Sequence, residues 1–242
     1  MITVTDIHKH FEDQEVLHGI SATFDAGRTN LIIGRSGSGK TVLLRCIVGL
    51  LVPNQGKVLY DGRDIHHLTK NEGTLLRQEM GMLFQGAALF DSMNVLQNVL
   101  FPLEMFSNKT HRERLQRARF CLDRVGLTNA EGKMPSELSG GMQKRVAIAR
   151  AIALAPRYLF CDEPNSGLDP ISSRIIDSLI SDITHDYNIT TIVNTHDMSS
   201  VYNIGEQVLF IHEGRAEWTG SNRNIGASTN PHLCEFIRNS RI

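Results

Sequence analysis

The sequence has little net charge and no closely spaced cysteines. Its 25 Lys and Arg residues nearly balance 26 Asp and Glu residues, which leaves a formal net charge of −1 at pH 7. This balance argues against a broad basic surface that would bind nucleic acid, so we expect no nucleic-acid partner. Because the cysteines form neither a CxxC pair nor a metal-ligand spacing, we expect buried, reduced thiols. They are Cys46, Cys121, Cys161 and Cys234.

The sequence also has no long hydrophobic run. Its most apolar helix candidate, residues 42–52, is too short to span a bilayer and contains Arg45. The first six residues alternate like a strand, whereas a signal peptide has a charged region followed by an apolar one. We therefore expect a soluble chain without a membrane segment of its own, so that any membrane role depends on a partner.

The pattern of apolar residues indicates an α/β fold. Helical periodicity alternates with short β-branched runs from residue 139 onward, which predicts a mostly parallel sheet covered on both faces. Strand-like runs separated by turns dominate the first 85 residues and predict an antiparallel β region there.

Residues 86–138 differ from their surroundings. Their periodicity is helical, Pro102 is expected to act as a break, and residues 109–124 carry the mixed charges of a solvated helix face. We interpret this segment as a helical subdomain inserted into a core formed by residues 1–85 and 139–220. Residues 221–242 are expected to form a short tail, and the chain a single domain over residues 1–242.

The most informative stretch is residues 34–41, which read Gly-Arg-Ser-Gly-Ser-Gly-Lys-Thr. It follows an apolar run and precedes an amphipathic segment, and this order of strand, glycine-rich loop and helix is the context that a phosphate-binding loop requires. Lys40 can reach the β- and γ-phosphates and the Thr41 hydroxyl can bind Mg²⁺. The predicted nucleotide-binding residues are Gly34, Arg35, Ser36, Gly37, Ser38, Gly39, Lys40 and Thr41.

Two acids follow a second apolar run, residues 158–161. Asp162 ends the predicted strand, where a P-loop ATPase needs a carboxylate to hold Mg²⁺. Glu163 is expected to point elsewhere and to polarise the attacking water as a general base.

A second phosphate-binding candidate lies at residues 138–142, Leu-Ser-Gly-Gly-Met, at the start of a predicted helix. Ser139, Gly140 and Gly141 offer backbone N–H groups at a helix N-terminus. One nucleotide does not need two such cradles from one subunit. We therefore expect two subunits to bury two nucleotides between them, each completing the site of the other.

Together these motifs resemble the ATP-binding subunits of ABC transporters, over nearly the whole chain. Residues 34–41 resemble the Walker A motif, residues 138–142 the signature, and residues 159–162 the Walker B motif with Glu163 as catalytic base. The resemblance implies a P-loop NTPase core, ATP and Mg²⁺ as cofactors, a second ATPase copy, and ATP hydrolysis coupled to transport.

Four more positions fit the resemblance. Gln85 resembles the Q-loop glutamine, whose amide meets Mg²⁺ or the attacking water next to the helical subdomain. His196 resembles the switch histidine that hydrogen-bonds the γ-phosphate, and Asp169, in the D-loop, is expected to act across the dimer interface. Phe11 corresponds to the A-loop aromatic, where tyrosine is commoner; the residue alone fits stacking on the purine and closure over the core about equally.

A narrower resemblance is to the ATPases of MCE-associated lipid transporters of the Mla type, on residues 82–95, 98–99, 102–103 and 134–137. It implies phospholipid transport, an integral membrane permease, an MCE-type lipid-binding protein, and a location on the cytoplasmic face of the inner membrane. Importers of small polar solutes such as amino acids share part of the pattern and are the alternative. A soluble non-transport ABC ATPase fits less well. DNA-repair members of this kind have a long coiled coil between the two halves of the core, whereas only 52 residues separate Gln85 from Leu138 here.

Overall fold

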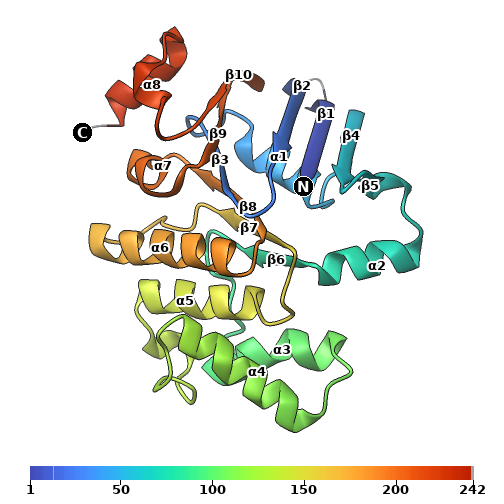
Figure 1. The fold of residues 1–242 in the computed structure, drawn as a ribbon, viewed down its shortest axis with the longest axis vertical. Helices are drawn as coiled ribbons and strands as arrows, with labels where there is room; N and C mark the ends of the chain where they lie inside the picture. Colours follow the sequence, from blue (N-terminus) through green and yellow to red (C-terminus); the bar gives the residue numbers. More distant parts are fainter. Residues whose placement is uncertain (13, 241–242) are drawn as a thin grey trace.

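The computed structural model describes residues 1–12 and 14–240 and contains two sheets (Figure 1). The smaller sheet is antiparallel, with strand order β2-β1-β4-β5. Its strands come from the first part of the chain, which confirms the predicted antiparallel region. They are β1 (Ile2–Phe11), β2 (Gln14–Phe24), β4 (Gln55–Tyr60) and β5 (Arg63–Asp64).

The larger sheet is mostly parallel, with strand order β10-β9-β3-β8-β7-β6. Every neighbouring pair is parallel except β9 and β10, which form a hairpin. This agrees with the predicted α/β fold. The strands are β3 (Thr29–Ile33), β6 (Met80–Leu83), β7 (Tyr158–Asp162), β8 (Thr190–Thr195), β9 (Gln207–His212) and β10 (Arg215–Gly220).

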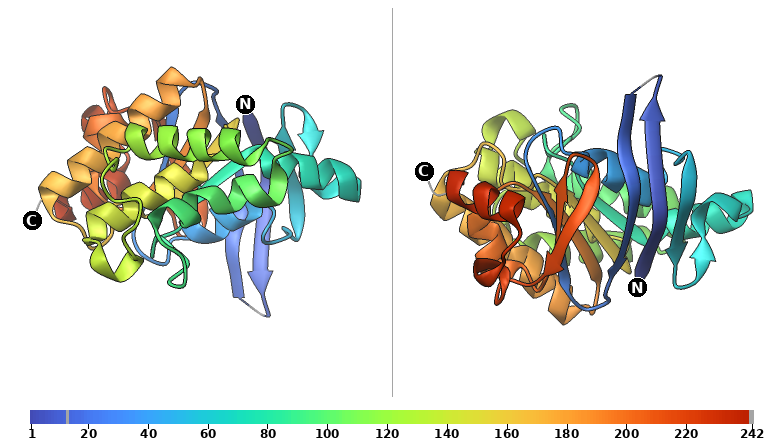
Figure 2. Two further views of the ribbon diagram at one scale, coloured as in Figure 1. Left: turned by 90° about the horizontal axis from the view of Figure 1, so that it is seen from below. Right: turned by 90° about the horizontal axis from the view of Figure 1, so that it is seen from above.

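The larger sheet separates two hydrophobic cores. Along β3, Leu31 and Ile33 face one core and Ile32 faces the other, as the alternation of a strand requires. The core beneath Ile32 is shared with the antiparallel sheet and with α1 (Lys40–Ile47). The opposite core is covered by α5 (Gly140–Ala151), α6 (Pro170–Asp186) and α7 (Met198–Ile204), as Figures 1 and 2 show. A central parallel sheet buried on both faces results.

The remaining helices lie at the periphery. α3 (Val95–Phe106) and α4 (His111–Arg124) pack on α5, on the side away from the antiparallel sheet. α2 (Lys70–Gln78) precedes β6, and α8 (Pro231–Asn239) lies beside β9 and β10. Three short 3₁₀ helices also occur, at Ile65–His67, Pro135–Glu137 and Ile225–Ala227.

Pro102 does not break a helix, contrary to the prediction, but lies inside α3. The helix begins at a strong cap, because Asn94 and Gln97 bond reciprocally to each other's backbone N–H groups. Val99 and Leu103 are buried on its inner face. This packing outweighs the one backbone hydrogen bond that a proline removes.

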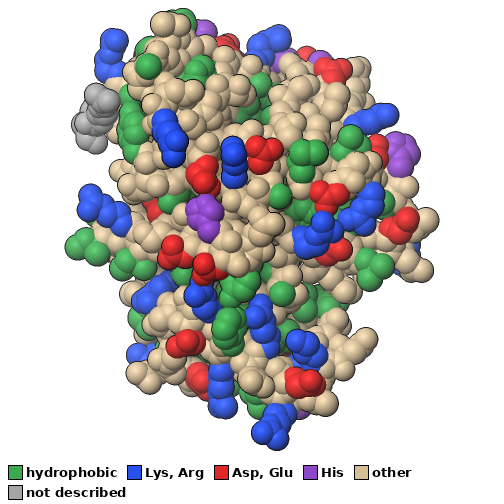
Figure 3. Space-filling view, in the orientation of Figure 1, with side chains coloured by type: hydrophobic (Ala, Val, Ile, Leu, Met, Phe, Trp, Pro, Cys, Tyr) green, Lys and Arg blue, Asp and Glu red, His purple; other side chains and the backbone are tan. Residues whose placement is uncertain are grey.

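The surface carries both signs of charge. On the face in Figure 3, basic and acidic side chains are interspersed, which agrees with the small net charge. Within residues 1–12 and 14–240, no helix combines the length and the apolarity needed to cross a membrane.

Candidate nucleotide-binding site

The loop at residues 34–39 connects β3 to α1 in a conformation that its glycines permit. Gly39, which precedes α1, has a φ of 101°, in the left-handed region. At Gly34 a Cβ atom would lie 2.3 Å from the carbonyl oxygen of Ile211, so a larger residue would force β3 and β9 apart. The Oγ of Ser38 is buried without a hydrogen-bond partner among the described residues. The loop thus offers an unsatisfied polar group, as a phosphate-binding cradle does.

Lys40 lies in the loop with its ammonium folded back on the backbone. Its Nζ donates to the carbonyl oxygens of Gly34, at 2.8 Å, and Arg35, at 2.9 Å. Burial lowers the pKa of Lys40, while the charges of Glu163 and Asp162 act in the opposite direction. A phosphate group in the loop would supply the missing counter-charge.

Thr41 and Asp162 meet at the ends of α1 and β7. The Thr41 Oγ1 donates to Asp162 Oδ1 at 3.4 Å, and Asn194 Nδ2 donates to the same oxygen at 3.1 Å. A hydroxyl and a carboxylate side by side are the hard oxygen donors that Mg²⁺ prefers. Asn194 was not among the predicted site residues. Its register opposite Asp162, which the sequence does not specify, puts it there.

Glu163 faces a different partner from Asp162. Its φ of 49° turns the chain at the end of β7, and its Oε2 lies 2.7 Å from His196 Nδ1. The Glu163 side chain is only 15% exposed, whereas that of His196 is 63% exposed. A carboxylate held by an imidazole at a cavity wall has the geometry of a base oriented by a second group.

Of these groups, Lys40, Thr41, Glu163 and His196 line one cavity of about 660 Å³. Its walls include Arg35, Lys40, Gln85, Glu163 and His196, so the structure brings together predictions that lie far apart in the sequence. The volume lies within the range of small-molecule sites. Gln85 reaches the cavity, but its Nε2 donates to Ser166 Oγ at 3.3 Å rather than to Thr41 or Asp162.

Ser139, Gly140 and Gly141 are not among the residues that line this cavity. Ser139 caps α5, with its Oγ accepting from the Met142 N–H at 3.3 Å. The two predicted phosphate cradles are therefore separate within one chain.

Five other predicted residues are not among those that line this cavity: Gly34 and Ser38 in the loop, Asp162 beside Thr41, and Asp169 and Phe11. Asp169 caps α6 by accepting from the N–H groups of Ile171 and Ser172, and its hydrogen bonds to Ser172 lower its pKa. Phe11 belongs to β1 rather than to a connection, and its ring is 43% exposed beneath the Lys9 ammonium, so it does not close over the core.

The C-terminal helix contributes to the cavity, which the sequence motifs did not indicate. Phe236, Asn239 and Ser240 line it, and Glu235 Oε1 lies 2.5 Å from Arg35 Nη2. This helix, α8, lies within the residues expected to form a short tail. Its contact with the phosphate loop depends on how the chain returns after β10, for which no motif exists.

The nucleotide site and the fold agree with comparisons to known proteins. The model of the ABC transporter family matches residues 17–166, and the chain belongs to this family. It is the ATP-binding subunit of a transporter and an ATPase.

Three relatives indicate which transport ATPases this chain is similar to. The chain is 38% identical to the intermembrane phospholipid transport system ATP-binding protein MlaF of Haemophilus influenzae, over 93% of this chain and 86% of that one. It is 37% identical to MlaF of Escherichia coli K12, over 92% and 82%. A probable ribonucleotide transport ATP-binding protein of Mycobacterium tuberculosis H37Rv is 34% identical over 100% of this chain and 67% of its own length.

Solved structures of ATP-binding cassettes also superpose on this chain. The dimeric cassette MJ0796, in a post-hydrolysis state bound to ADP and Pi, superposes with a TM-score of 0.82 at 30% identity, over 92% of this chain and 99% of that one. The cbiO1 subunit from Clostridium perfringens superposes with a TM-score of 0.86 at 28% identity, over 98% of both chains.

Proposed function

We propose that this ATPase drives phospholipid transport through a membrane permease. The observation that carries the proposal is the identity of 37–38% to two MlaF proteins over most of both chains. The sequence likeness extends beyond the catalytic motifs, which transporters of different cargo share.

We assign the chemistry to the groups that meet in the cavity. Lys40 and the N–H groups of the loop hold the phosphates, while Thr41 and Asp162 hold Mg²⁺. Mg²⁺ supplies charge neutralisation at the phosphate oxygens. Glu163 accepts the proton of the attacking water, and His196 orients Glu163 and approaches the γ-phosphate.

A second copy of the chain completes each site. Ser139 and Gly140 are exposed on the surface, so they are free to approach a phosphate held by another subunit. The dimeric form of the related cassette supports this arrangement. In the dimer, residues 139–141 of one copy cover the nucleotide of the other, with Phe11 stacking on its base and Asp169 near the interface.

The surface around Gln85 docks the permease. Phe84 and Phe90 are 42% and 39% exposed, and Met105 and Phe106, at the end of α3, are 60% and 50% exposed. An exposed apolar surface of this kind is typical of a protein contact. The cytoplasmic face of the inner membrane is then the location, and an MCE-type lipid-binding protein the further partner.

The link from nucleotide to permease runs through the backbone after Gln85. Ala87 and Ala88 both have positive φ values, 60° and 48°, and Arg150 of α5 holds their carbonyl oxygens. Lys144 Nζ holds the carbonyl oxygen of Gln85 itself. Strained backbone conformations cluster at switch regions, and here α5 holds the strained turn through Lys144 and Arg150, so a shift of α5 on dimer closure would move this surface.

Transport of a small polar solute is the second candidate. The mycobacterial relatives named for ribonucleotide transport match this chain over its full length. Their identity of 34% is below that to MlaF, and the cargo is chosen by subunits other than the ATPase.

Affinity purification of the tagged protein from its native membranes tests the proposal, with mass spectrometry of bound proteins and lipids and with untagged membranes as control. We expect a multi-spanning permease, an MCE-domain protein and phospholipid. A permease with a small-solute binding protein would contradict lipid transport and favour the second candidate. Ribosomes or DNA in place of a permease would overturn the assignment of partners.

A further inference from the structure

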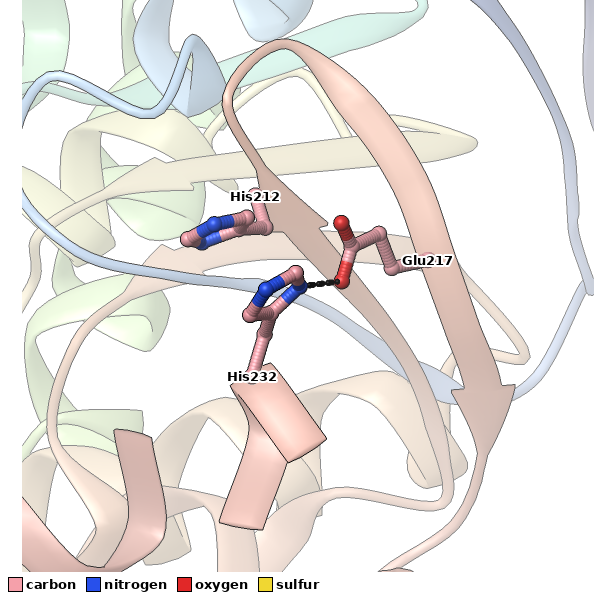
Figure 4. Close-up of side chains that lie close together, drawn as sticks. All are labelled: His212, Glu217 and His232. Atoms are coloured by element: carbon pink, nitrogen blue, oxygen red, sulfur yellow. Dashed lines mark hydrogen bonds and ion pairs between the residues drawn. The ribbon is translucent and has the colours of Figure 1, made fainter. Parts of the chain in front are cut away.

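Three metal-binding side chains meet at the junction of the C-terminal helix and the β9–β10 hairpin. His212 ends β9, Glu217 lies in β10, and His232 lies in the first turn of α8 (Figure 4). One ligand atom from each lies within 4.8 Å of those from the other two. We propose that these three residues bind a divalent transition-metal ion of the Zn²⁺ type, separate from the nucleotide site.

The donor set fits such an ion. Two imidazoles and one carboxylate are the protein ligands of many zinc sites that keep a fourth position for water. Imidazole donors select Zn²⁺, Cu²⁺ or Ni²⁺ over Mg²⁺, which prefers oxygen in an octahedron. The ion at this site therefore differs in kind from the one that Thr41 and Asp162 hold.

The side chains are already held close to one another. His232 Nδ1 lies 2.7 Å from Glu217 Oε2, and the rings of His212 and His232 are stacked with their centroids 4.1 Å apart. Ligand atoms on tetrahedral Zn²⁺ are about 3.4 Å apart, given bonds of about 2.1 Å. Side-chain rotation over about 1 Å thus closes the site. The ion takes the place of the proton between Nδ1 and Oε2, and the His232 ring keeps its proton on Nε2.

The surroundings restrict the three side chains. Those of His212 and Glu217 are only 21% and 20% exposed, and that of His232 is 46% exposed. The Phe210 ring stacks beneath His212 and also packs on Phe236 of α8. Two imidazoles and one carboxylate, partly buried and close together, offer three donor atoms to a divalent cation.

Binding at this site fastens the C-terminal helix. It cross-links β10 to α8 across the segment between Glu217 and His232, and constraints of this kind favour the folded form of the segment they close. One turn further along α8, Glu235 pairs with Arg35, and the end of the helix lines the nucleotide cavity. The metal ion thereby fixes a wall of that cavity.

Titration of the nucleotide-free, chelator-treated full chain with ZnCl₂ tests the proposal, followed by calorimetry and by the absorption of Co²⁺ as a substitute ion. We expect one ion per chain and the intense visible bands of tetrahedral Co²⁺. His232→Asn and Glu217→Gln should each weaken binding at least tenfold and remove those bands. Equal binding by the wild type and both variants, or no binding by the wild type, would overturn the site.

Two variants serve as controls. His185 also pairs with a carboxylate, Glu206 at 3.1 Å, but among residues 1–12 and 14–240 it belongs to no three-residue cluster, so His185→Asn should bind Zn²⁺ like the wild type. Cys234 is a thiol two residues from His232, and Cys234→Ser should likewise keep the ion. Loss of binding in Cys234→Ser would contradict the proposed ligand set.

Hydrogen exchange gives a readout that is independent of affinity. Zn²⁺ should slow amide exchange in residues 231–240 of the wild type and leave it unchanged in Glu217→Gln, whose shape is nearly the same. Slowing of equal size in both proteins, or in neither, would contradict the cross-link. Neither measurement uses nucleotide, so the outcome does not depend on the proposed transport function.

Discussion

The ammonium of Lys40 is buried and donates hydrogen bonds to two backbone carbonyl oxygens, in a position from which it can bind a phosphate. Removing the ammonium takes away a charged donor to the β- and γ-phosphates. We expect Lys40→Ala to lose ATP affinity by on the order of 100-fold, since a charged hydrogen bond contributes about 1.5–3 kcal/mol. Binding of a fluorescent ATP analogue measures this. Lys57→Ala, at an exposed lysine of β4, should bind normally, and unchanged binding by Lys40→Ala would refute the site.

The four cysteines differ in reactivity because they differ in burial. Burial raises the pKa of Cys46 and Cys121 to about 11 and that of Cys161 to about 12, whereas Cys234 is only half-buried. We expect a disulfide reagent at pH 8 to modify one thiol per folded chain, at Cys234, and four after denaturation. Rapid modification of two or more thiols in the folded chain would contradict this burial.

The same thiols predict how stability changes at high pH. A folded-state pKa above the unfolded value means that the unfolded chain loses the proton first. Below pH 9 there is no effect, and the free energy of unfolding should fall as the pH rises from about 9 toward 12. Urea unfolding between pH 8 and 10.5 measures this fall, and replacement of Cys161 by Ala should make it smaller.

At the scale of the elements, the loop before α3 depends on one buried side chain. Asn98 is fully buried, and its amide donates to the carbonyl oxygens of Phe90, Met93 and Asn94 while its Oδ1 accepts from the Phe90 N–H. This loop carries the exposed surface that we assign to the permease.

We expect Asn98→Ala to lower the free energy of unfolding by about 2–4 kcal/mol, because it removes a buried amide that makes four hydrogen bonds to the backbone of the loop. Chemical denaturation measures this loss. The exposed Asn108 is the control, and Asn108→Ala should change stability by less than about 0.5 kcal/mol. A loss below 1 kcal/mol in Asn98→Ala would mean that the loop does not depend on these bonds.

Most strands and the longer helices could be predicted from the sequence, because each carries a clear period or cap. Two helices were missed. α2 begins at a capping box between Thr69 and Glu72 that the sequence displays, but its mean polarity hides the apolar face, of which only Leu76 is buried. α7 is too short for a period to show. The predicted helix break at Pro102 was wrong because tertiary packing outweighs local helix propensity there.

The residues of the site likewise fall into those that could be predicted from the sequence and those that could not. Residues within motifs, such as Lys40, Asp162 and Glu163, were predicted because the motif fixes their spacing along the chain. Asn194 was not, because strand register brings it to Asp162. The end of α8 was not, because it reaches the cavity through the path of the chain after β10. Such contacts follow from packing over long sequence distances, which no local pattern encodes.

At the scale of the whole molecule, each chain carries two candidate phosphate cradles that lie apart from each other. The phosphate loop and Glu163 line the cavity, while Ser139 and Gly140 are exposed and do not line it. A nucleotide bound in one chain therefore still has an open side. We expect a second copy of the chain to close it, so that the free energy of ATP binding favours the dimer.

The most direct test is the mass of Glu163→Gln in solution, with and without ATP and Mg²⁺, by size-exclusion chromatography with light scattering. Without its base the variant should bind ATP but not hydrolyse it, so we expect a monomer alone and a stable dimer with two ATP bound. A second change, Ser139→Arg, should abolish the dimer while ATP still binds. A Glu163→Gln protein that binds ATP and remains monomeric, or that hydrolyses it at the wild-type rate, would contradict the account.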